Sequence, residues 1–249
     1  MIQKTLGIIF LNIISISIAC AESDERAAVK LINDMEAIYR GKASTATLTM
    51  TITSPHYKRT MKMTSQNLGK EFSFIRILSP KKDKGIATLK RYKEMWNFFP
   101  KINKRIKVPP SMMMGSWMGS DFTNDDLIKQ TTLTEDYALS LKENDSDYTI
   151  TLVPKEQTIT VWGKIEYIVN KEYRVPVAQK FYDEQGKLIR TLDFKAIKNF
   201  SGRMIPSVLI MTPLNKKGHK TTIVYDELEF DPEGIVETTF SLRNLKKRT

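Results

Sequence analysis

The chain has 249 residues, of which 41% are hydrophobic and 27% are charged. This is the composition of a folded globular protein, and it excludes an intrinsically disordered chain. The formal net charge is +11, a surplus that favours anionic partners such as membrane headgroups or acidic proteins. A generally basic proteome is the alternative explanation for this charge.

Residues 1–21 have the features of a signal peptide. Lys4 gives the segment a positive start, and residues 6–18 form an apolar stretch that is too short to span a bilayer as a helix. Small residues occupy the two positions that a signal peptidase recognises, within the sequence Ala-Cys-Ala at 19–21. We therefore expect cleavage before Glu22 and export to the periplasm, which argues against nucleic acid as a partner.

The single cysteine, Cys20, lies in this segment. It offers a second interpretation, a lipoprotein signal in which Cys20 becomes lipidated, but Ser17 stands where such a signal needs an aliphatic residue. After cleavage the mature chain contains no cysteine, so it has neither a disulfide nor a thiol nucleophile. We expect a soluble mature protein, because no later stretch reaches the roughly 20 apolar residues of a membrane helix.

Residues 23–39 are predicted to form an opening helix. Apolar residues recur there at helical spacing, Ser23 is a suitable N-cap, and Gly41 follows the last turn. The period then changes to two. Between Ser44 and Thr53, alanine, leucine, methionine and isoleucine alternate with five threonines, as in a strand with one apolar face.

Further strands are predicted along the rest of the chain, separated by turn signals rich in Gly, Asn and Asp. They are expected at residues 60–64, 72–78, 86–91, 94–99, 105–108, 137–141, 148–153, 159–170, 175–182, 188–198, 204–212 and 221–230. Short helices are predicted at Asn124–Lys129 and Leu242–Lys247.

This order of elements predicts one mainly β (α+β) domain from residue 22 to residue 249, built on an antiparallel meander. The apolar face of such a sheet must be covered by a second sheet, by closure or by helices. The opening helix and the segment 109–130 are the natural covers.

The sequence contains no recognisable catalytic or metal-binding pattern. His56 and His219 each stand in a predicted turn, without ligand spacing to a second His or Cys. Asp121, Asp125 and Asp126 do not match a calcium-binding loop, and helix capping explains the last two. We therefore predict a protein that is not an enzyme and that uses no cofactor and no metal.

The segment PPSMMMGSWMGSDFTNDD at 109–126 concentrates four methionines between Met112 and Met118. Methionine fills irregular gaps and adapts to ligands of varying shape. Two prolines precede the methionines, and Gly115 and Gly119 allow the backbone to bend. The segment is either a lid on an apolar cavity or a plug at the end of the core. The lid hypothesis assigns ligand contacts to Met112, Met113, Met114, Trp117, Met118 and Phe122.

A second group of candidate residues begins in the predicted strand 94–99. Trp96 and Phe98 share one face of the strand and are expected near the cavity mouth. A basic group then follows, formed by Lys101, Lys104, Arg105 and Lys107. These cations suit phosphate headgroups or an acidic partner, or they form a solvated hairpin face.

Residues 95–127 resemble the most recognisable segment of the outer-membrane lipoprotein-sorting proteins, relatives of the LolA and LolB periplasmic carriers. The shared pattern is Trp96, Pro100-Lys101, the basic residues up to Lys107, Ser116, Met118 to Phe122, and Asp125-Asp126. The resemblance implies a strongly curved antiparallel sheet forming an incomplete β barrel, with helices as a lid over a hydrophobic cavity that holds acyl chains.

The resemblance therefore implies a periplasmic carrier for a lipid or an acylated, lipoprotein-like cargo, acting as a monomer with transient contact to the membrane surface. Members of the broader group are often encoded beside membrane exporters, which implies an inner-membrane exporter complex as a partner. The alternative is a non-enzymatic envelope interaction or sensor module, accessory to such an exporter, in which the methionine segment docks on a protein.

Overall fold

The computed structural model describes residues 24–129 and 133–246. The expected signal peptide with Cys20, the expected N-cap Ser23 and the expected last helical residue Lys247 lie outside these residues.

The described residues contain thirteen strands joined in one antiparallel sheet. The strands are β1 (Ala43–Thr53), β2 (Lys58–Leu68), β3 (Phe72–Ser79), β4 (Ala87–Arg91), β5 (Glu94–Phe99), β6 (Lys104–Lys107), β7 (Tyr137–Glu143), β8 (Asp147–Pro154), β9 (Lys164–Asn170), β10 (Pro176–Tyr182), β11 (Leu188–Phe200), β12 (Arg203–Pro213) and β13 (Lys220–Phe230).

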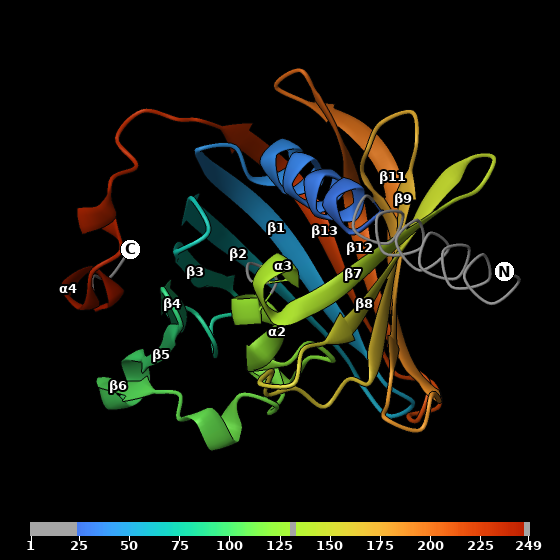
Figure 1. The fold of residues 1–249 in the computed structure, drawn as a ribbon. Helices are drawn as coiled ribbons and strands as arrows, with labels where there is room; N and C mark the ends of the chain where they lie inside the picture. The colour runs from blue at the N-terminus through green and yellow to red at the C-terminus, as the bar shows by residue number, and fades with distance from the viewer. Residues whose placement is uncertain (1–23, 130–132, 247–249) are drawn as a thin grey trace, which may run out of the picture.

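The spatial order of the strands is β6-β5-β4-β3-β2-β1-β13-β12-β11-β10-β9-β8-β7. Two meanders, β1 to β6 and β7 to β13, are thus joined through the β1–β13 pair at the middle of the sheet. The first and last strands of this order, β6 and β7, do not pair with each other. The sheet is strongly curved (Figure 1) and forms the predicted incomplete barrel.

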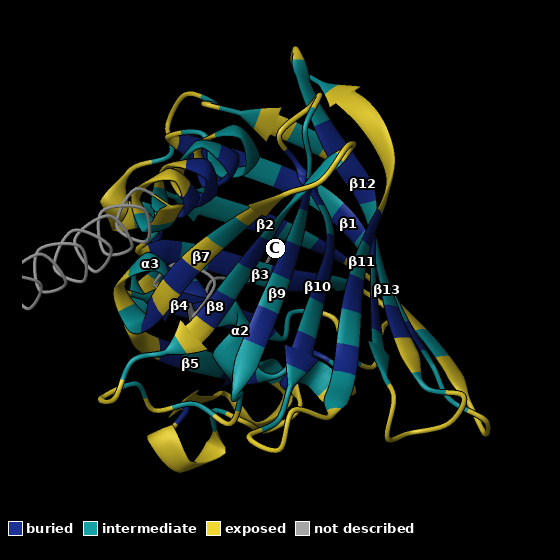
Figure 2. Cartoon of the chain, turned by 45° about the vertical axis from the view of Figure 1, so that its right-hand side comes forward, coloured by how far each residue is buried: buried dark blue, intermediate teal, exposed yellow. Residues whose placement is uncertain are grey.

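The alternation predicted from the sequence is present in the strands. In β1, Ala46, Leu48, Met50 and Ile52 are buried on the inner face, whereas the intervening threonines are partly exposed. Figure 2 shows the same alternation as dark blue and teal bands along β9, β10 and β11. Side chains of successive strand residues point to opposite faces, so this pattern gives the sheet an apolar inner face.

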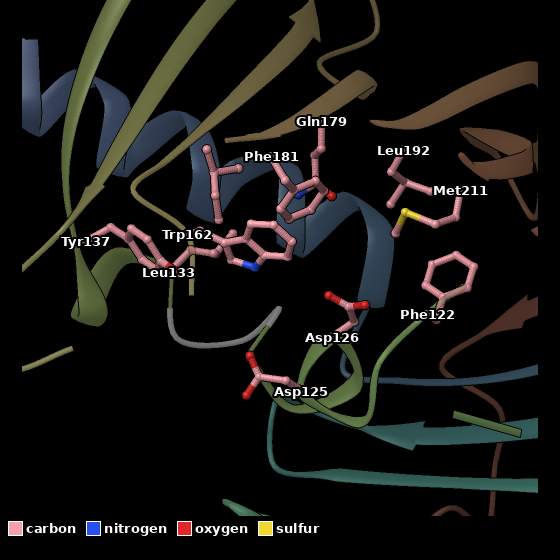
Figure 3. Close-up of a pocket in the computed structure, with 11 residues that line it drawn as sticks. Phe122, Asp125, Asp126, Leu133, Tyr137, Trp162, Gln179, Phe181, Leu192 and Met211 are labelled. Carbon is pink, nitrogen blue, oxygen red and sulfur yellow. The ribbon is translucent and has the colours of Figure 1, made fainter. Parts of the chain in front are cut away.

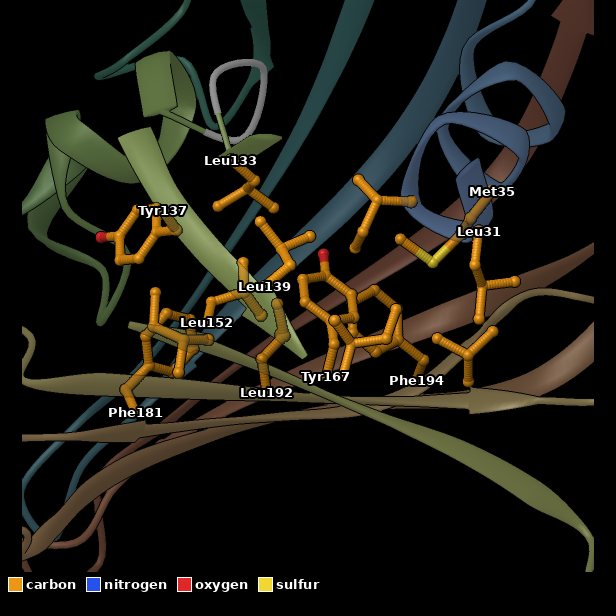
Figure 4. Close-up of a cluster of buried hydrophobic side chains, with 14 of the residues drawn as sticks. Leu31, Met35, Leu133, Tyr137, Leu139, Leu152, Tyr167, Phe181, Leu192 and Phe194 are labelled. Atoms are coloured by element: carbon orange, nitrogen blue, oxygen red, sulfur yellow. The ribbon is translucent and has the colours of Figure 1, made fainter. Parts of the chain in front are cut away.

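A helix at residues 24–40 lies across the inner face of the sheet (Figure 1). Its buried residues Leu31 and Met35 point toward Tyr167 of β9 and Phe194 of β11 (Figure 4), within the largest core cluster. Gly41 ends the helix with a φ of 64°, and an added Cβ there would lie 3.0 Å from Oδ1 of Asp231. The left-handed backbone and the close approach explain why a glycine follows the last turn.

Between β6 and β7 the chain must cross the open side of the barrel, because these two strands are the opposite edges of the sheet. Residues 108–129 and 133–136 lie along this crossing and contain the short elements η2 (Pro110–Met112), η3 (Trp117–Gly119), α2 (Asn124–Lys129) and α3 (Leu133–Asp136). We call residues 108–129 the lid segment. It contains the methionine-rich sequence, and α2 has the bounds that the sequence predicts.

The C-terminal residues cover the outer face of β3, β4 and β5. Residues 235–245 contain η4 (Glu237–Thr239) and α4 (Leu242–Leu245), and their residues Phe240 and Leu245 are fully buried in a cluster with Phe72 and Phe74. Arg76, also on this face, donates hydrogen bonds to the backbone carbonyls of residues 244 and 245. Both faces of this part of the sheet are therefore covered.

One predicted strand is shorter than expected. β9 begins at Lys164 and not at Ile159, because the chain turns at Gly163. An added Cβ at Gly163 would lie 2.5 Å from the backbone oxygen of Asp183, so only glycine fits this approach. The preceding Trp162 turns inward and packs against Phe181, with 5.1 Å between the ring centroids.

Candidate ligand-binding cavity

A cavity of about 220 Å³ lies between the curved sheet, the helix at residues 24–40 and the lid segment. Its apolar wall on the first meander is formed by Leu48, Met63 and Ile75, which belong to three adjacent strands. The opposite wall comes from the second meander and contains Tyr167, Pro176, Phe194, Leu209, Ile223, Tyr225 and Leu228.

The lid segment closes the cavity with Trp117, Phe122 and Leu127. Trp117 is 4% exposed and packs into the cluster of β1, β2 and β3 residues that includes Leu48, Met50 and Met63. Phe122 belongs instead to the core under the helix at residues 24–40. The two aromatic residues thus connect the lid segment to two different cores on the two sides of the barrel.

The register of the first four strands makes one end of the cavity polar. Ser44 of β1 faces Asn67 of β2, Asn67 faces Ser73 of β3, and Ser73 faces Lys90 of β4. All four line the cavity, and we call them the polar row. Four residues further along each of the first three strands, a second row is entirely apolar and consists of Leu48, Met63 and Ile77.

The last two turns of the helix add charged side chains to the cavity. Glu36 lines it and pairs with Lys70, with 2.8 Å between the charged atoms. Arg40, one turn later, also lines the cavity, and its Nε is buried without a hydrogen-bond partner in the described residues. Burial raises the pKa values of Tyr167 and Tyr225, and Arg40 opposes both increases, so its guanidinium lies near these two phenols.

Lys90 is the most deeply buried cation at the cavity, with 4% of its surface exposed. Its pKa is lowered to about 7, mainly by burial and also by the nearby Arg40, whereas Glu71 and Glu36 oppose the decrease. Its Nζ donates to the backbone oxygen of Ile128 at 3.2 Å. Lys90 therefore joins the polar end of the cavity to the end of helix α2.

The lid segment is fastened to the first meander by three side chains. The indole of Trp117 donates to Oγ1 of Thr88 at 3.0 Å, and Lys90 holds the end of α2 as described. Arg59 of β2 donates from Nη1 to the backbone oxygen of Met118 at 3.2 Å, and its Nη2 pairs with Asp83 at 2.8 Å. Met118 accepts this bond in a left-handed conformation with a φ of 53°.

The second meander holds the lid segment through a buried ion pair. Arg190 of β11 donates to the two carboxylate oxygens of Asp126 at 2.9 and 2.5 Å. Its guanidinium lies 4.5 Å from the ring centroid of Trp162 and 4.2 Å from that of Phe181. The backbone N–H of Asp121 also donates to Oγ1 of Thr221 at 2.9 Å. The lid segment is therefore held against both meanders.

A second, smaller hollow of about 40 Å³ lies on the other side of α2, against β9 to β12. Figure 3 shows Asp126 and Phe122 on the lid side of this hollow, with Gln179 and Phe181 on the sheet opposite. Phe122 and Asp126 line both hollows. These two residues of the lid segment therefore form a common wall between the two hollows.

The methionines of the lid segment do not act as one group. Met118 packs against the core of β1, β2 and β3, and Met113 packs against Met95 and Val108. Met112 and Met114 point to solvent, with 60% and 39% of their surfaces exposed. Of the six lid residues predicted to contact a ligand, Trp117 and Phe122 line the cavity and the four methionines do not.

Trp96 and Phe98 are not at the cavity mouth, and the structure corrects that expectation. Their strand neighbours Leu89 and Ala87 pack with Phe240 and Leu245 on the outer face of the sheet. The two aromatic residues belong to that cluster. The sequence correctly places them on one face of the strand, but it contains no signal for the C-terminal segment that covers this face.

The basic residues are exposed around η1 (Pro100–Ile102) and β6, at one free edge of the sheet. Lys107 pairs with Glu94, and Arg105 donates to the backbone oxygen of Leu242 at 3.2 Å. Lys101 and Lys104 have no such partner within the described part of the chain. The hairpin therefore carries two unpaired cations and two engaged ones.

Sequence reasoning missed the charged residues Glu36, Arg40, Lys70 and Lys90 that line this cavity, and it missed the ion pair of Asp126 with Arg190. A signal exists for Lys90, since it lies in the predicted strand 86–91 at an inward position of the alternation. The others depend on which strands and helices are neighbours, which the sequence does not state.

Within residues 24–129 and 133–246, no group of three or more His, Cys, Asp or Glu side chains is placed to hold a metal ion. In the same residues, no helix combines the length and the apolar character needed to cross a membrane.

A family model described as "Uncharacterized protein" matches residues 69–247, which is well over half of the chain. The chain belongs to this family. The match includes β3 to β13 and the whole lid segment, so it contains most of the cavity. No curated protein sequence matches the chain.

Three solved structures show the same fold. A DUF1329 family protein from Desulfovibrio piger has a TM-score of 0.81 at 19% identity and covers 89% of this chain and 99% of its own. A domain described as an outer membrane lipoprotein-sorting protein, from Vibrio parahaemolyticus, has a TM-score of 0.77 at 20% identity and covers 91% of this chain and 100% of its own. A LolA superfamily protein from Nitrosomonas europaea has a TM-score of 0.72 at 20% identity and covers 87% of this chain and 98% of its own. These likenesses confirm the LolA-like fold expected from the resemblance.

Proposed function

We propose that this protein is a periplasmic carrier that binds acyl chains of a lipid or acylated lipoprotein cargo in the cavity under the lid segment. One observation carries the proposal: an apolar cavity is enclosed by the curved sheet and closed by a segment that is fastened to both meanders. The LolA-like fold, shared with a protein described as lipoprotein-sorting, supports it. The proposed role is that of a binding protein and not of an enzyme, and it needs no cofactor.

Cargo exchange in this proposal proceeds by opening of the lid segment. The closed cavity of about 220 Å³ is only moderately larger than an engineered cavity of about 150 Å³ that binds benzene. It therefore accommodates part of one acyl chain, and a larger cargo enters only when α2 moves and the two hollows merge. A cargo shifts this equilibrium only by binding the open and closed states with different affinity.

Docking to a membrane surface is assigned to the basic hairpin of β5 and β6. Lys101 and Lys104 are exposed, and the apolar side chains of Ile102 and Ile106 in the same hairpin are 59% and 46% exposed. Cations surrounding exposed apolar side chains suit an anionic lipid surface, where each lysine contributes about 1 kcal/mol. The proposed carrier works as a monomer that binds this surface transiently.

The exposed Met112 and Met114 also favour a second function, an envelope interaction module accessory to an inner-membrane exporter. Exposed apolar side chains on a soluble protein mark interfaces. In this alternative the cavity stays empty and the lid segment docks on a protein partner. The two functions differ in whether the cavity takes an acyl chain.

The test is native mass spectrometry of the protein purified from its own periplasm, followed by organic extraction of bound lipid. Ala46→Phe fills the cavity from β1 without introducing a charge, because Ala46 lines the cavity. Thr47→Phe is the matched control, since the neighbouring residue points to the other face of the strand. The carrier proposal predicts a stoichiometric acyl species that is lost in Ala46→Phe and retained in Thr47→Phe. A protein that remains without ligand when acyl lipids are supplied would favour the interaction module.

A further inference from the structure

We infer that the cavity contains a binding site for the anionic head group of an amphiphilic ligand, a carboxylate or a phosphate, formed by Arg40, Lys90 and the polar row. This inference rests on the proposed function and names the kind of head group that accompanies the acyl chain. It places the head group inside the barrel, at the end of the cavity below the last turn of the helix at residues 24–40.

The first step of the argument is the segregation of polar and apolar residues along the cavity. Because the strands are in register, Ser44, Asn67 and Ser73 lie side by side at one end, and Leu48, Met63 and Ile77 lie side by side four residues away. Trp117 packs on the apolar row. A ligand that matches both rows is therefore amphiphilic, with its apolar part toward the lid segment.

The second step concerns the sign of the charge. Lys70 is neutralised by its pairing with Glu36 at 2.8 Å, and Asp126 is engaged by Arg190. Arg40 forms no hydrogen bond or ion pair within the described residues, and its buried Nε has no acceptor. A buried N–H donor without an acceptor is costly. An anion beside Arg40 and Lys90 would provide the missing acceptor.

The third step concerns neutral donors. The side-chain amide of Asn67 donates to Oγ of Ser44 and to Oγ of Ser65, at 3.2 Å in both cases. A hydroxyl that accepts one hydrogen bond still has its own O–H to donate. The amide therefore leaves the hydroxyls of Ser44 and Ser65 free to donate to an anion. Ser73, the next member of the row, adds a third hydroxyl.

Isothermal titration with four probes of equal chain length tests the inference. The probes are dodecanoate, dodecyl phosphate, dodecanol and dodecyltrimethylammonium, each below its micellar concentration. Binding is measured at about pH 6, where most Lys90 side chains are charged because their pKa is about 7. We expect both anionic probes to bind more tightly than dodecanol, and whichever binds more tightly identifies carboxylate or phosphate as the preferred head group.

Arg40→Gln should weaken both anionic probes by about tenfold or more, because a charge-assisted hydrogen bond is lost, and it should leave dodecanol unchanged. Ser73→Ala is a second, milder variant expected to act in the same direction. Arg243→Gln removes one exposed positive charge from α4, away from the cavity, and serves as the control. Retained dodecanol binding shows that each variant is folded.

Equal binding of dodecanoate and dodecanol, or tighter binding of the cationic probe, would overturn the anionic site and leave the carrier proposal intact. Failure of all four probes to bind the unmodified protein would overturn both the anionic site and the carrier proposal. An Arg40→Gln variant that binds the anionic probes as tightly as the unmodified protein would also contradict the inference.

Discussion

The ammonium group of Lys90 lies at the cavity with 4% of the residue exposed, and its pKa is lowered to about 7 mainly by burial. In the unfolded chain the same group has a pKa near its ordinary value of 10.5. Between these two values the unfolded state binds one more proton than the folded state, so the free energy of unfolding rises with pH. The contribution of neutral Lys90 to the free energy of unfolding is complete above pH 10.5, and it is lost as the pH falls through about 7.

This linkage predicts the pH dependence of one substitution. In Lys90→Met the buried charge is absent, so the pH-dependent part of the stability, at most roughly 4–5 kcal/mol, disappears. Urea unfolding of both proteins at several pH values between 6 and 10 measures the difference. The stability of the unmodified protein relative to Lys90→Met should rise with pH. A difference that stays constant over this range would show that Lys90 is not desolvated in the cavity.

Arg190 shows why single residues of a site escape prediction. In the sequence it stands in a predicted strand, where an arginine suggests a solvated face. In the structure it is buried, it stacks on Trp162 and Phe181, and it holds Asp126, which is 64 positions away. The sequence explains Asp126 by helix capping, and indeed Asp126 accepts from the backbone of Thr123 at 2.8 Å. Its second role, as the partner of Arg190, can be predicted only when the strand that faces α2 is known.

At the scale of elements, the central feature is the fastening of α2 to the second meander. Arg190→Ala leaves the largely buried carboxylate of Asp126 without its partner, and breaking such a pair costs about 3–5 kcal/mol. We expect faster amide hydrogen exchange in residues 117–129 and a lower free energy of unfolding.

Arg174→Ala is the matched control for this substitution. Arg174 pairs with Asp34 at 3.2 Å, but 49% of the arginine side chain and 34% of the aspartate side chain are exposed. Such surface pairs contribute about 1 kcal/mol or less. If Arg190→Ala left the exchange of the lid segment as slow as Arg174→Ala does, the ion pair would not hold the lid closed.

The β5–β6 hairpin is the element assigned to membrane contact. Lys101→Glu with Lys104→Glu should abolish binding to vesicles that contain anionic lipid, and binding of the unmodified protein should weaken with salt. Sedimentation of vesicles with bound protein measures both effects. Lys216→Glu with Lys217→Glu reverses two exposed charges on another turn and should leave most binding intact. An equal loss of vesicle binding in both double variants would indicate that the net charge of the protein attracts it to the vesicles without a defined binding surface.

Most elements can be predicted from the sequence because each has a strong local pattern. The alternation in β1, the helical spacing of residues 24–40 and the acidic start of α2 each depend on neighbours within a few positions. The predicted strand 159–170 is longer than β9 because the late start of β9 depends on Gly163 approaching Asp183, 20 positions further along the chain. The η turns and α3 are too short to have a periodic signature.

At the scale of the whole molecule, the strand order determines the site. Pairing of β1 with β13 leaves β6 and β7 as opposite edges, so the connection between them must cross the open side of the barrel. The sequence shows that this connection is long and apolar, and the resemblance implies a lid. Neither the fastening contacts nor the polar row can be derived from the sequence, because both require the register between strands.

The central claim is that an acyl chain enters the cavity and reaches the lid segment. Trp117 lines the cavity, whereas Trp96 lies on the outer face of the sheet. A protein with Trp117 as its single tryptophan, made by Trp96→Phe and Trp162→Phe, is titrated with an acyl chain that carries a quenching bromine at its methyl end. A second protein that retains only Trp96 is titrated in the same way. Saturable quenching of Trp117 alone is the predicted result, and equal or absent quenching in the two proteins would contradict an acyl-binding cavity.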